Sequence, residues 1–570
     1  MCGISGIIST EPIDIMALQK MSKALKHRGP DGYGYMLYNP TIGIETWLNT
    51  ESLPAQNYTI GFAHRRLAII DLTEKSLQPM SDSLGKYCIT YNGELYNYIE
   101  LRDELKKLGY AFQTSGDTEV VLKSYMAWGV DCFKKFNGMW ALAILDLNNQ
   151  NIILSRDRFG IKPLYTTLIG KGLYFASEIK AFLSLQPFQP NKTIIDKYIA
   201  TGIVDAGSQT FFNSIESFPS AQFMIFDLMT GQRKTQAYWE FPSQENSTNE
   251  INTYSSLLLD AVRLHARSDV PIGICLSGGL DSSSLVYLLD KSIRNGQIAC
   301  PSLHAVSYIS SDEKWSEKRY MEKIASVFPV TMNYVNISDK QMAEAIPEVV
   351  KSQDEPFGSA SILAQWFVFK QAKEKKLKVM LDGQGADESL AGYVPFVSMT
   401  QQNIINKIKY LLLCGQQVPK LNNVLMDYMK YFSLPAILRH EDRNSMHFSI
   451  ESRVPFLDYR LIDFVFSLAD RWKIRGGTTK YILREAMKTK LPEEIRVRKD
   501  KIGFKAAPSL TFNYIKSHLS ILIAAKTDYE KECLDNKSAI DMLYNVSESP
   551  LDEFRAWRII NLKLWLRNLY

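Results

Sequence analysis

A cysteine follows the first methionine of the chain directly. If the small Cys2 side chain permits removal of Met1, the processed chain begins with a thiol beside a free α-amine. The amine has an ordinary pKa of about 7.7–8.0 and the thiol one of about 8.5, so the amine can serve as the thiol's general base. Cys2 is therefore a candidate nucleophile that needs no catalytic histidine. Most cysteines at second positions are incidental, so the surrounding motifs must decide.

Three further motifs offer groups that suit a substrate beside this thiol. Asn92 and Gly93 provide a side-chain amide and an open backbone N–H, which together can bind the oxyanion of a tetrahedral acyl intermediate. Arg66 offers a guanidinium for a carboxylate, and Asp117 offers a carboxylate for an ammonium group. Taken singly, Asn92-Gly93 is equally typical of a hairpin turn and Asp117 of a helix cap. Together, the cation and the anion fit the two ends of a free amino acid.

A glycine-rich loop lies in the second half of the chain, between a predicted strand over 272–276 and a predicted helix over 282–289. It reads Ser277-Gly278-Gly279-Leu280-Asp281-Ser282-Ser283. Glycines let backbone N–H groups approach a phosphate, and the helix N-terminus adds its positive dipole end. The lysine of a Walker A loop is absent, which argues against γ-phosphoryl transfer. Asp281 instead suits a magnesium ion on a pyrophosphate.

A second loop of similar character, Asp382-Gly383-Gln384-Gly385-Ala386-Asp387-Glu388, follows a predicted strand over 377–381. Asp387 and Asp281 together could bracket Mg²⁺, which prefers hard oxygen ligands. Between Arg471 and Lys505 there are 12 Lys and Arg against 4 Asp and Glu. A solvated basic face or nucleic-acid affinity would also explain this excess. Beside a predicted ATP site we expect it to neutralise pyrophosphate, through Lys480.

The elements that must position these residues follow two patterns. The first half reads as short strands and turns, interrupted by predicted helices over 98–108 and from Asp117 to about Trp128. A polar stretch over 242–253 is typical of a linker, although a surface loop within one domain is an alternative. Beyond it strands and helices alternate, which favours a parallel sheet covered by helices. From about Gln401 the segments look helical.

Composition narrows the class of protein. The 570 residues are 46% hydrophobic and 22% charged with a net charge of +5, which excludes wholesale disorder and gives no reason to expect nucleic acid or a membrane as partner. No apolar run approaches the roughly 20 residues that span a bilayer. The seven cysteines include no CxxC pair, and the N-terminus does not resemble a secretory signal. We therefore expect a cytoplasmic protein of about two to four domains with reduced cysteines.

The motifs of the first half, in order, resemble those of class II glutamine amidotransferases: Cys2-Gly3-Ile4, His27–Asp31, Arg66–Asp71, Asn92–Asn97 and Gly116–Glu119. SGGLDSS resembles the PP-loop of ATP pyrophosphatases. With further matches at Arg156–Tyr165, Ala176–Ala181 and Arg453–Asp458, the whole chain resembles the glutamine-hydrolysing asparagine synthetase B family. The resemblance implies an α+β Ntn-hydrolase-like αββα sandwich over 2–212, a connecting segment over 213–253, and an α/β PP-loop domain with a helical C-terminal part over 254–570.

The resemblance also assigns roles to residues. Cys2 would attack the side-chain amide of glutamine, with Asn92 and Gly93 as the oxyanion hole. The residues that would bind glutamine are Arg66, Leu67, Ile69, Glu94 and Asp117. Those that would bind ATP are Leu276, Ser277, Gly278, Gly279, Asp281, Ser282, Tyr308, Asp382, Gly383 and Lys480, with Mg²⁺ on Asp281 and Asp387. The expected reaction converts aspartate to asparagine and releases AMP, pyrophosphate and glutamate, and homodimer formation is left open.

The second loop departs from the family pattern Ser-Gly-Glu-Gly-Ser-Asp-Glu. At the place of its Glu, which the family associates with the β-aspartyl-AMP intermediate, stands the neutral Gln384, and Asp382 replaces its first Ser. Either another carboxylate such as Glu355 or Glu388 has taken over, or the acceptor is a different acid such as a sugar uronate. A non-catalytic paralogue that senses glutamine or ATP, and an RNA-modifying PP-loop enzyme, are more distant alternatives. The first should have lost Cys2 or Asp281, and the second should carry an RNA-binding module.

Overall fold

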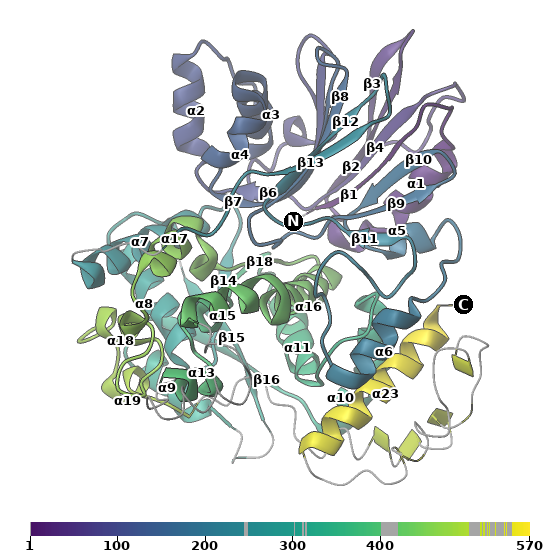
Figure 1. Ribbon diagram of the computed structural model, residues 1–570. Coiled ribbons are helices and arrows are strands. Elements are labelled where there is room, and N and C mark those ends of the chain that lie inside the picture. Colours follow the sequence, from purple (N-terminus) through teal and green to yellow (C-terminus); the bar gives the residue numbers. More distant parts are fainter. Residues whose placement is uncertain are drawn as a thin grey trace.

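The computed structural model describes residues 2–243, 249–300, 302–310, 313, 316–400, 420–500, 514–515, 517–518, 521–522, 524, 530–531, 541, 543 and 550–569. The helical region predicted from about Gln401 onward therefore begins outside the described residues, since 401–419 are not among them. Figure 1 shows a β-rich part above and a helix-rich part below, with the N-terminus at the junction of the two.

Two antiparallel sheets pack face to face in the β-rich part. The first has seven strands in the order β11 (Ile215–Ser217), β9 (Tyr165–Ile169), β10 (Gly172–Ala176), β1 (Gly3–Ile8), β4 (Ile60–Arg66), β2 (Gly32–Asn39) and β3 (Gly43–Leu48). The second has six, in the order β13 (Arg233–Ala237), β12 (Gln222–Asp227), β8 (Asn151–Arg156), β7 (Gly138–Asp146), β6 (Tyr87–Leu95) and β5 (Met80–Ser81).

Helices cover the outer face of each sheet. The first sheet carries α1 (Ile15–Ala24) and α5 (Lys180–Leu183), and the second carries α3 (Asp117–Trp128), against which α2 (Tyr98–Lys107) packs. The short α4 (Cys132–Lys135) follows α3, and α6 (Lys192–Thr201) reaches toward the helix-rich part. The predicted αββα sandwich is confirmed, and so are its two predicted helices.

The alternation of side chains along β7 explains why this strand is central. Ala141, Ala143 and Leu145 belong to the apolar cluster between the two sheets. Trp140, Leu142 and Ile144 belong to the cluster beneath α3 on the opposite face. Successive side chains of a strand point to opposite faces, so a strand buried on both sides reads as one continuous apolar run.

The segment predicted to connect the domains, 213–253, is largely part of this fold. Strands β11, β12 and β13 lie within it and pair with β9 and β8, and α7 (Glu250–His265) begins before its end. Since these strands extend the two sheets, we propose that the first domain continues to about residue 239.

The helix-rich part is built on a parallel sheet in the order β16 (Val330–Asn336), β15 (Leu303–Ile309), β14 (Ile272–Cys275), β17 (Val379–Leu381) and β18 (Glu451–Arg453). The strand order reverses between β14 and β17. In open parallel sheets such a reversal leaves a crevice at the carboxyl ends of the two strands, where ligands bind. Both predicted loops, after β14 and after β17, begin at this crevice. The predicted α/β class of this part is confirmed.

Helices surround this sheet (Figure 1). They are α7, α8 (Leu280–Arg294), α9 (Lys318–Ala325), α10 (Asp339–Ser352), α11 (Ser361–Glu374), α12 (Ala386–Ser389), α13 (Val394–Thr400), α15 (Leu421–Asp427), α16 (Leu434–His447), α17 (Tyr459–Ser467), α18 (Tyr481–Ala486), α19 (Glu493–Arg496) and α23 (Pro550–Asn568). Apolar residues from both parts share one buried cluster, for example Leu67 and Met139 with Leu258 and Leu457. Within the described residues, no helix has the length and apolar character that crossing a membrane requires.

A buried aspartate organises the turn after β8. One oxygen of Asp157 accepts the N–H groups of Phe159 and Ile161 at 3.0 and 2.9 Å. The other accepts those of Lys162 and Trp140 at 2.9 and 3.2 Å. Four backbone donors in a buried turn thus depend on one carboxylate.

We expect Asp157→Asn to destabilise the protein. The amide nitrogen cannot accept hydrogen bonds, so about two buried N–H groups lose their acceptor, at about 1–3 kcal/mol each. Urea unfolding followed by circular dichroism should show the loss in the transition of the first domain. Asp227→Asn is the control, because Asp227 accepts N–H groups of Met229 and Thr230 in an exposed turn. Equal stability of the two variants would contradict this interpretation of the turn.

Candidate active site

The Cys2 thiol is buried at the start of β1, at the junction of the two parts (Figure 1). Its Sγ lies 4.0 Å from the carbonyl oxygen of Leu67, and its backbone nitrogen donates to Asn92 Oδ1 at 2.9 Å. Burial raises the pKa of the thiol, so a nucleophile here needs a base. His64 is unsuited to that task, because burial lowers its pKa to about 3 and its Nε2 is hydrogen-bonded to the Tyr91 carbonyl.

The Asn92 amide is oriented by its contact with Cys2. Because Oδ1 accepts the Cys2 N–H, the Nδ2 group is the free end, and it is buried with no hydrogen-bond partner among the described residues. An unpaired buried donor costs free energy that an incoming acceptor can recover. Gly93 is the next residue of β6, opposite Trp140 of β7. The arrangement fits the predicted oxyanion hole.

The residues predicted to hold glutamine surround this point, and several already have protein partners. Arg66 donates to the carbonyls of Asp71 and Thr73, the latter at 2.7 Å, so two of its five N–H groups hold the loop after β4. Asp117 Oδ2 accepts the Leu95 N–H at 2.9 Å and the Tyr91 hydroxyl at 3.1 Å. Burial raises the pKa of the Asp117 carboxyl.

Two other predicted glutamine ligands contact the second domain. The Ile69 carbonyl accepts the N–H of Asp269 at 3.0 Å. The Glu94 carboxylate lies 3.5 Å from the Arg453 guanidinium, and burial raises the pKa of Glu94 well above its usual range. The glutamine-side motif therefore also forms part of the domain contact.

The glycine-rich loop after β14 is held in shape by its own hydroxyls. Ser277 Oγ accepts the Gly279 N–H at 3.3 Å and is hydrogen-bonded to Ser282 Oγ at 3.2 Å. Gly278 has φ +71°, and a Cβ there would lie 2.7 Å from Tyr320 Cβ, so a side chain does not fit. The predicted residues Leu276 and Tyr308 lie beside the loop, at the carboxyl ends of β14 and β15.

Lys480 joins the two loops. Its Nζ lies 2.6 Å from Asp281 Oδ2 and 2.7 Å from Asp387 Oδ1, and all three residues are buried. Gly392 makes room for this contact, since a Cβ there would lie 1.9 Å from Asp387 Oδ1 and 2.4 Å from Lys480 Cε. A Cβ on Gly383 would likewise be 3.1 Å from Asp281 Cβ, so the second loop lies against the first.

These carboxylates fit a magnesium ion bound together with a substrate. The Asp281 and Asp387 carboxylates converge on one position, which the Lys480 ammonium group occupies in this structure. Magnesium is commonly held by one or two carboxylates and completed by phosphate oxygens and water. The described residues contain no cluster of three His, Cys, Asp or Glu that would hold a metal alone. Substrate phosphates would have to supply the remaining ligands.

The second loop continues toward α16. The Asp382 N–H donates to the Arg453 carbonyl at 2.9 Å and the Gly383 N–H to Asp382 Oδ1 at 2.6 Å. Gln384 Nε2 donates to Glu441 Oε2 at 3.3 Å. Glu441 is a residue that the sequence reading missed, since it lies in a charged run of α16 that resembles a solvated face.

A buried ion-pair cluster joins Cys2 to the other side of α16. Arg28 donates from Nε to the Cys2 carbonyl at 2.9 Å and from both terminal nitrogens to Asp442, at 2.7 and 3.0 Å. Glu178 also contacts Arg28, at 2.5 Å, and Arg443 lies 3.2 Å from Asp442. Burial alone would raise the pKa of Asp442, but the neighbouring guanidinium groups lower it. The cluster is therefore charged.

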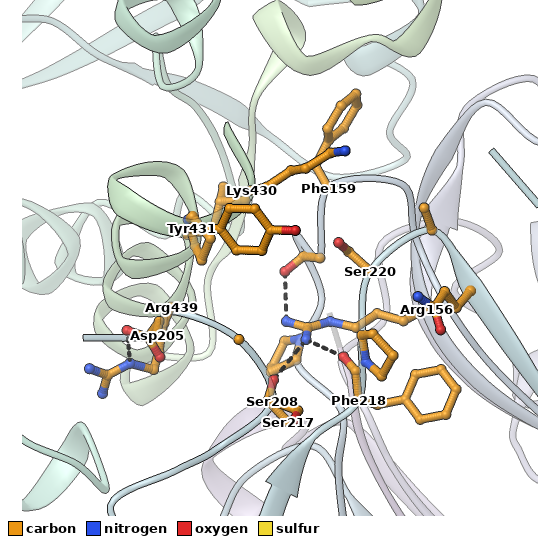
Figure 2. A pocket seen from close by; sticks show the side chains of 18 of the residues that line it. Arg156, Phe159, Asp205, Ser208, Ser217, Phe218, Ser220, Lys430, Tyr431 and Arg439 are labelled. Atoms are coloured by element: carbon orange, nitrogen blue, oxygen red, sulfur yellow. Dashed lines mark hydrogen bonds and ion pairs between the residues drawn. The ribbon is translucent and has the colours of Figure 1, made fainter. Parts of the chain in front are cut away.

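Two cavities flank α16. One of about 360 Å³ is lined by Gln384, Gln365, Ser359, Ser361, Ser433 and His440, among others, and its described lining includes no Asp, Glu, Lys or Arg. The other, of about 510 Å³, lies between the two parts of the molecule. Figure 2 shows two of its arginines engaged by protein groups: Arg156 with Ser217 and Phe218, and Arg439 with Asp205. The first cavity is the one that Gln384, from the loop after β17, lines.

Comparison with known proteins agrees with this two-part site. Residues 253–567 match the family described as Asparagine synthase, and residues 49–239 match the Glutamine amidotransferase domain. A Methanocaldococcus jannaschii protein named putative asparagine synthetase [glutamine-hydrolyzing] 2 is 35% identical over 442 residues, covering 74% of this chain and 81% of the relative. Asparagine synthetase [glutamine-hydrolyzing] 1 of Bacillus subtilis is 30% identical over 576 residues, covering 88% and 87%.

We expect Gly392→Ala to impair the phosphate loops selectively. The added methyl group must displace Asp387 or Lys480, and a misplacement of about 1 Å can cost about 100-fold in rate. The rate of ATP-dependent pyrophosphate release should fall about 100-fold, while the rate of glutamine hydrolysis should be unchanged. Gly296→Ala is the control, because a Cβ there meets nothing within 4 Å. Its φ of +67° disfavours alanine, a strain that Gly392 does not share, so the control carries the greater backbone strain and none of the contact. Full pyrophosphate release by Gly392→Ala would refute the assigned contact.

Proposed function

Because the chain belongs to the asparagine synthase family and is a glutamine-hydrolysing ligase, we propose that it converts aspartate to asparagine through an acyl-adenylate, with ATP, Mg²⁺ and glutamine as co-substrates. One observation carries the proposal: α16 and β18 contact the surroundings of Cys2 on one side, through Arg28 and Glu94, and the loop after β17 on the other. We further propose a cytoplasmic location, and leave homodimer formation open.

In the glutaminase step, the Cys2 thiol would attack the amide carbon of glutamine, with the processed α-amine as its base. The contact of the Cys2 nitrogen with Asn92 Oδ1 supports this, because it keeps the amine beside the thiol and turns Nδ2 toward a substrate oxygen. Arg66 and Asp117 would bind the carboxylate and the amine of glutamine. Collapse of the tetrahedral intermediate, with a proton passed to the leaving nitrogen, would release ammonia and leave a thioester on Cys2. Hydrolysis of this thioester would then release glutamate and restore the thiol.

In the synthetase step, the acceptor carboxylate would attack the α-phosphate of ATP and release pyrophosphate. The loop 276–282 and Tyr308 would hold the nucleotide. Asp281 and Asp387 would hold Mg²⁺, which would neutralise phosphate charge, and Lys480 would turn from these carboxylates to the pyrophosphate. The position of all three groups at the reversal of strand order supports this assignment.

The acceptor would occupy the cavity of about 360 Å³ beside Gln384. Its hydroxyl and amide lining gives one specific reason to retain a second candidate acceptor, a sugar uronate. The described lining offers no fixed charge for the α-carboxylate or α-amine of aspartate, whereas hydroxyls and amides suit a polyhydroxylated acid. Aspartate remains the proposed substrate because the curated relatives carry its product in their names.

We expect Cys2→Ala to abolish glutamine hydrolysis and to leave synthesis with added ammonium salt intact. The thiol and the phosphate loop lie in different domains, so removal of Sγ should not disturb the second site. Glutamate release and amide formation are measured with glutamine and with ammonium in parallel. Loss of both activities to the same extent would contradict a two-site enzyme.

We expect acid-dependent release of pyrophosphate and AMP, which phosphorus NMR distinguishes from ADP and phosphate. A panel containing aspartate and sugar uronates should identify the acceptor, with aspartate the most active acid. Asp281→Ala should remove Mg²⁺-dependent pyrophosphate release and spare glutaminase activity. Formation of ADP would refute adenylation, and a uronate turned over faster than aspartate would reassign the substrate.

A further inference from the structure

Three buried glutamates lie near the cavity that Gln384 lines, and they differ in what they contact. Glu388 accepts from the Tyr393 hydroxyl and, at 2.9 Å, from Ser433 Oγ. Glu355 accepts the Phe211 N–H at 2.7 Å and faces the interdomain cavity instead. Glu441 contacts Gln384 itself, at 3.3 Å. The replacements predicted from the sequence, Glu355 and Glu388, are therefore less well placed than Glu441.

We propose that Glu441 is the positioning residue for Gln384, orienting its amide toward the acceptor and placing behind it the negative charge that the Gln384 side chain itself lacks. This inference rests on the proposed function, and it extends that function by a residue on a different element, α16.

The hydrogen bonds around Glu441 fix the direction of the Gln384 side chain. Glu441 Oε2 accepts from Nε2 of both Gln384 and Gln365, and Oε1 accepts from Ser452 Oγ at 2.5 Å. A carboxylate is an acceptor, so it must face the amide nitrogen. The carbonyl oxygen of Gln384 is thereby turned away from Glu441. Both glutamines line the cavity of about 360 Å³, so this oxygen can accept an N–H from a bound nucleophile.

The second departure of the loop, Asp382, belongs to the same arrangement. Burial raises the pKa of Glu441 well above its usual range, and the adjacent Asp382 carboxylate raises it further. Two neighbouring carboxyl groups in such a site do not both ionise readily, so the negative charge belongs to the Glu441–Asp382 pair as a unit. Both residues that differ from the family pattern, Gln384 and Asp382, thus lie beside Glu441.

The charge is useful at the step that forms the amide. As ammonia bonds to an acyl carbon, its nitrogen gains positive charge. A fixed negative charge behind the hydrogen-bond acceptor of that nitrogen stabilises the transition state more than the ground state. A Glu at position 384 would supply both the acceptor and the charge, whereas here Gln384 supplies the acceptor and the Glu441–Asp382 pair supplies the charge.

The test moves the carboxylate from α16 to the loop. Glu441→Gln should lower kcat for acceptor amidation about 100-fold, as for loss of a positioned acid–base group, with little change in the KM for ATP. Gln384→Glu alone should also be slow, because it sets a second carboxylate against Glu441. The double variant Glu441→Gln with Gln384→Glu restores one carboxylate and one amide, and should recover to within about 10-fold of wild type.

Glutamine hydrolysis serves as the internal control for folding. Glu348→Gln is the matched control variant, because Glu348 lies on α10, away from Gln384, and its ion-pair contact is with His447 at 3.4 Å. Unchanged kcat in Glu441→Gln would overturn the inference. So would a double variant no faster than Glu441→Gln, which is the result a purely structural glutamate gives. If Glu441→Gln does not fold, the double variant is compared with Gln384→Glu instead, and a double variant no faster than Gln384→Glu overturns the inference. Absence of turnover in the wild-type enzyme with every acid would instead overturn the proposed function.

Discussion

The buried ion pair between Arg28 and Asp442 is the contact on which the two-site arrangement depends. Its two hydrogen bonds, at 2.7 and 3.0 Å, are out of reach of water, and the same guanidinium holds the Cys2 carbonyl. Breaking a buried pair by removing one partner typically costs about 3–5 kcal/mol, because the other charge is left uncompensated. The nucleophile strand is therefore anchored to α16, a helix of the other domain.

The other contacts between the two domains are arranged around this ion pair. Successive residues of a helix point about 100° apart, so Asp442 faces the glutaminase strand while Glu441 faces Gln384. Strand β18 makes a second connection: the Arg453 side chain reaches Glu94, and its backbone carbonyl accepts the Asp382 N–H. Apolar residues of both domains close the space around these polar contacts. Under the proposed function, ammonia released at Cys2 would start within one helix and one short strand of the loop that carries Gln384.

Local motifs were predictable from the sequence, and contacts between distant segments were not. Cys2 with Asn92, and the loop around Asp281, could be recognised because their chemistry depends on residue type and short spacing. Strands β11 to β13 were assigned to a connecting segment, because pairing with β9 and β8 leaves no local signal. Glu441 was missed for a related reason. A run of charged residues usually marks a solvated surface, and its burial here depends on Arg28, more than 400 positions away.

The central claim is that α16 and β18 hold the two sites close enough for nitrogen to pass without entering water. The most direct test supplies glutamine labelled in its amide nitrogen together with excess unlabelled ammonium, and measures the label in the product amide by mass spectrometry. The account predicts that the product retains the label in proportion to the glutamate released. Dilution of the label to the isotopic ratio of the bulk ammonium would contradict it.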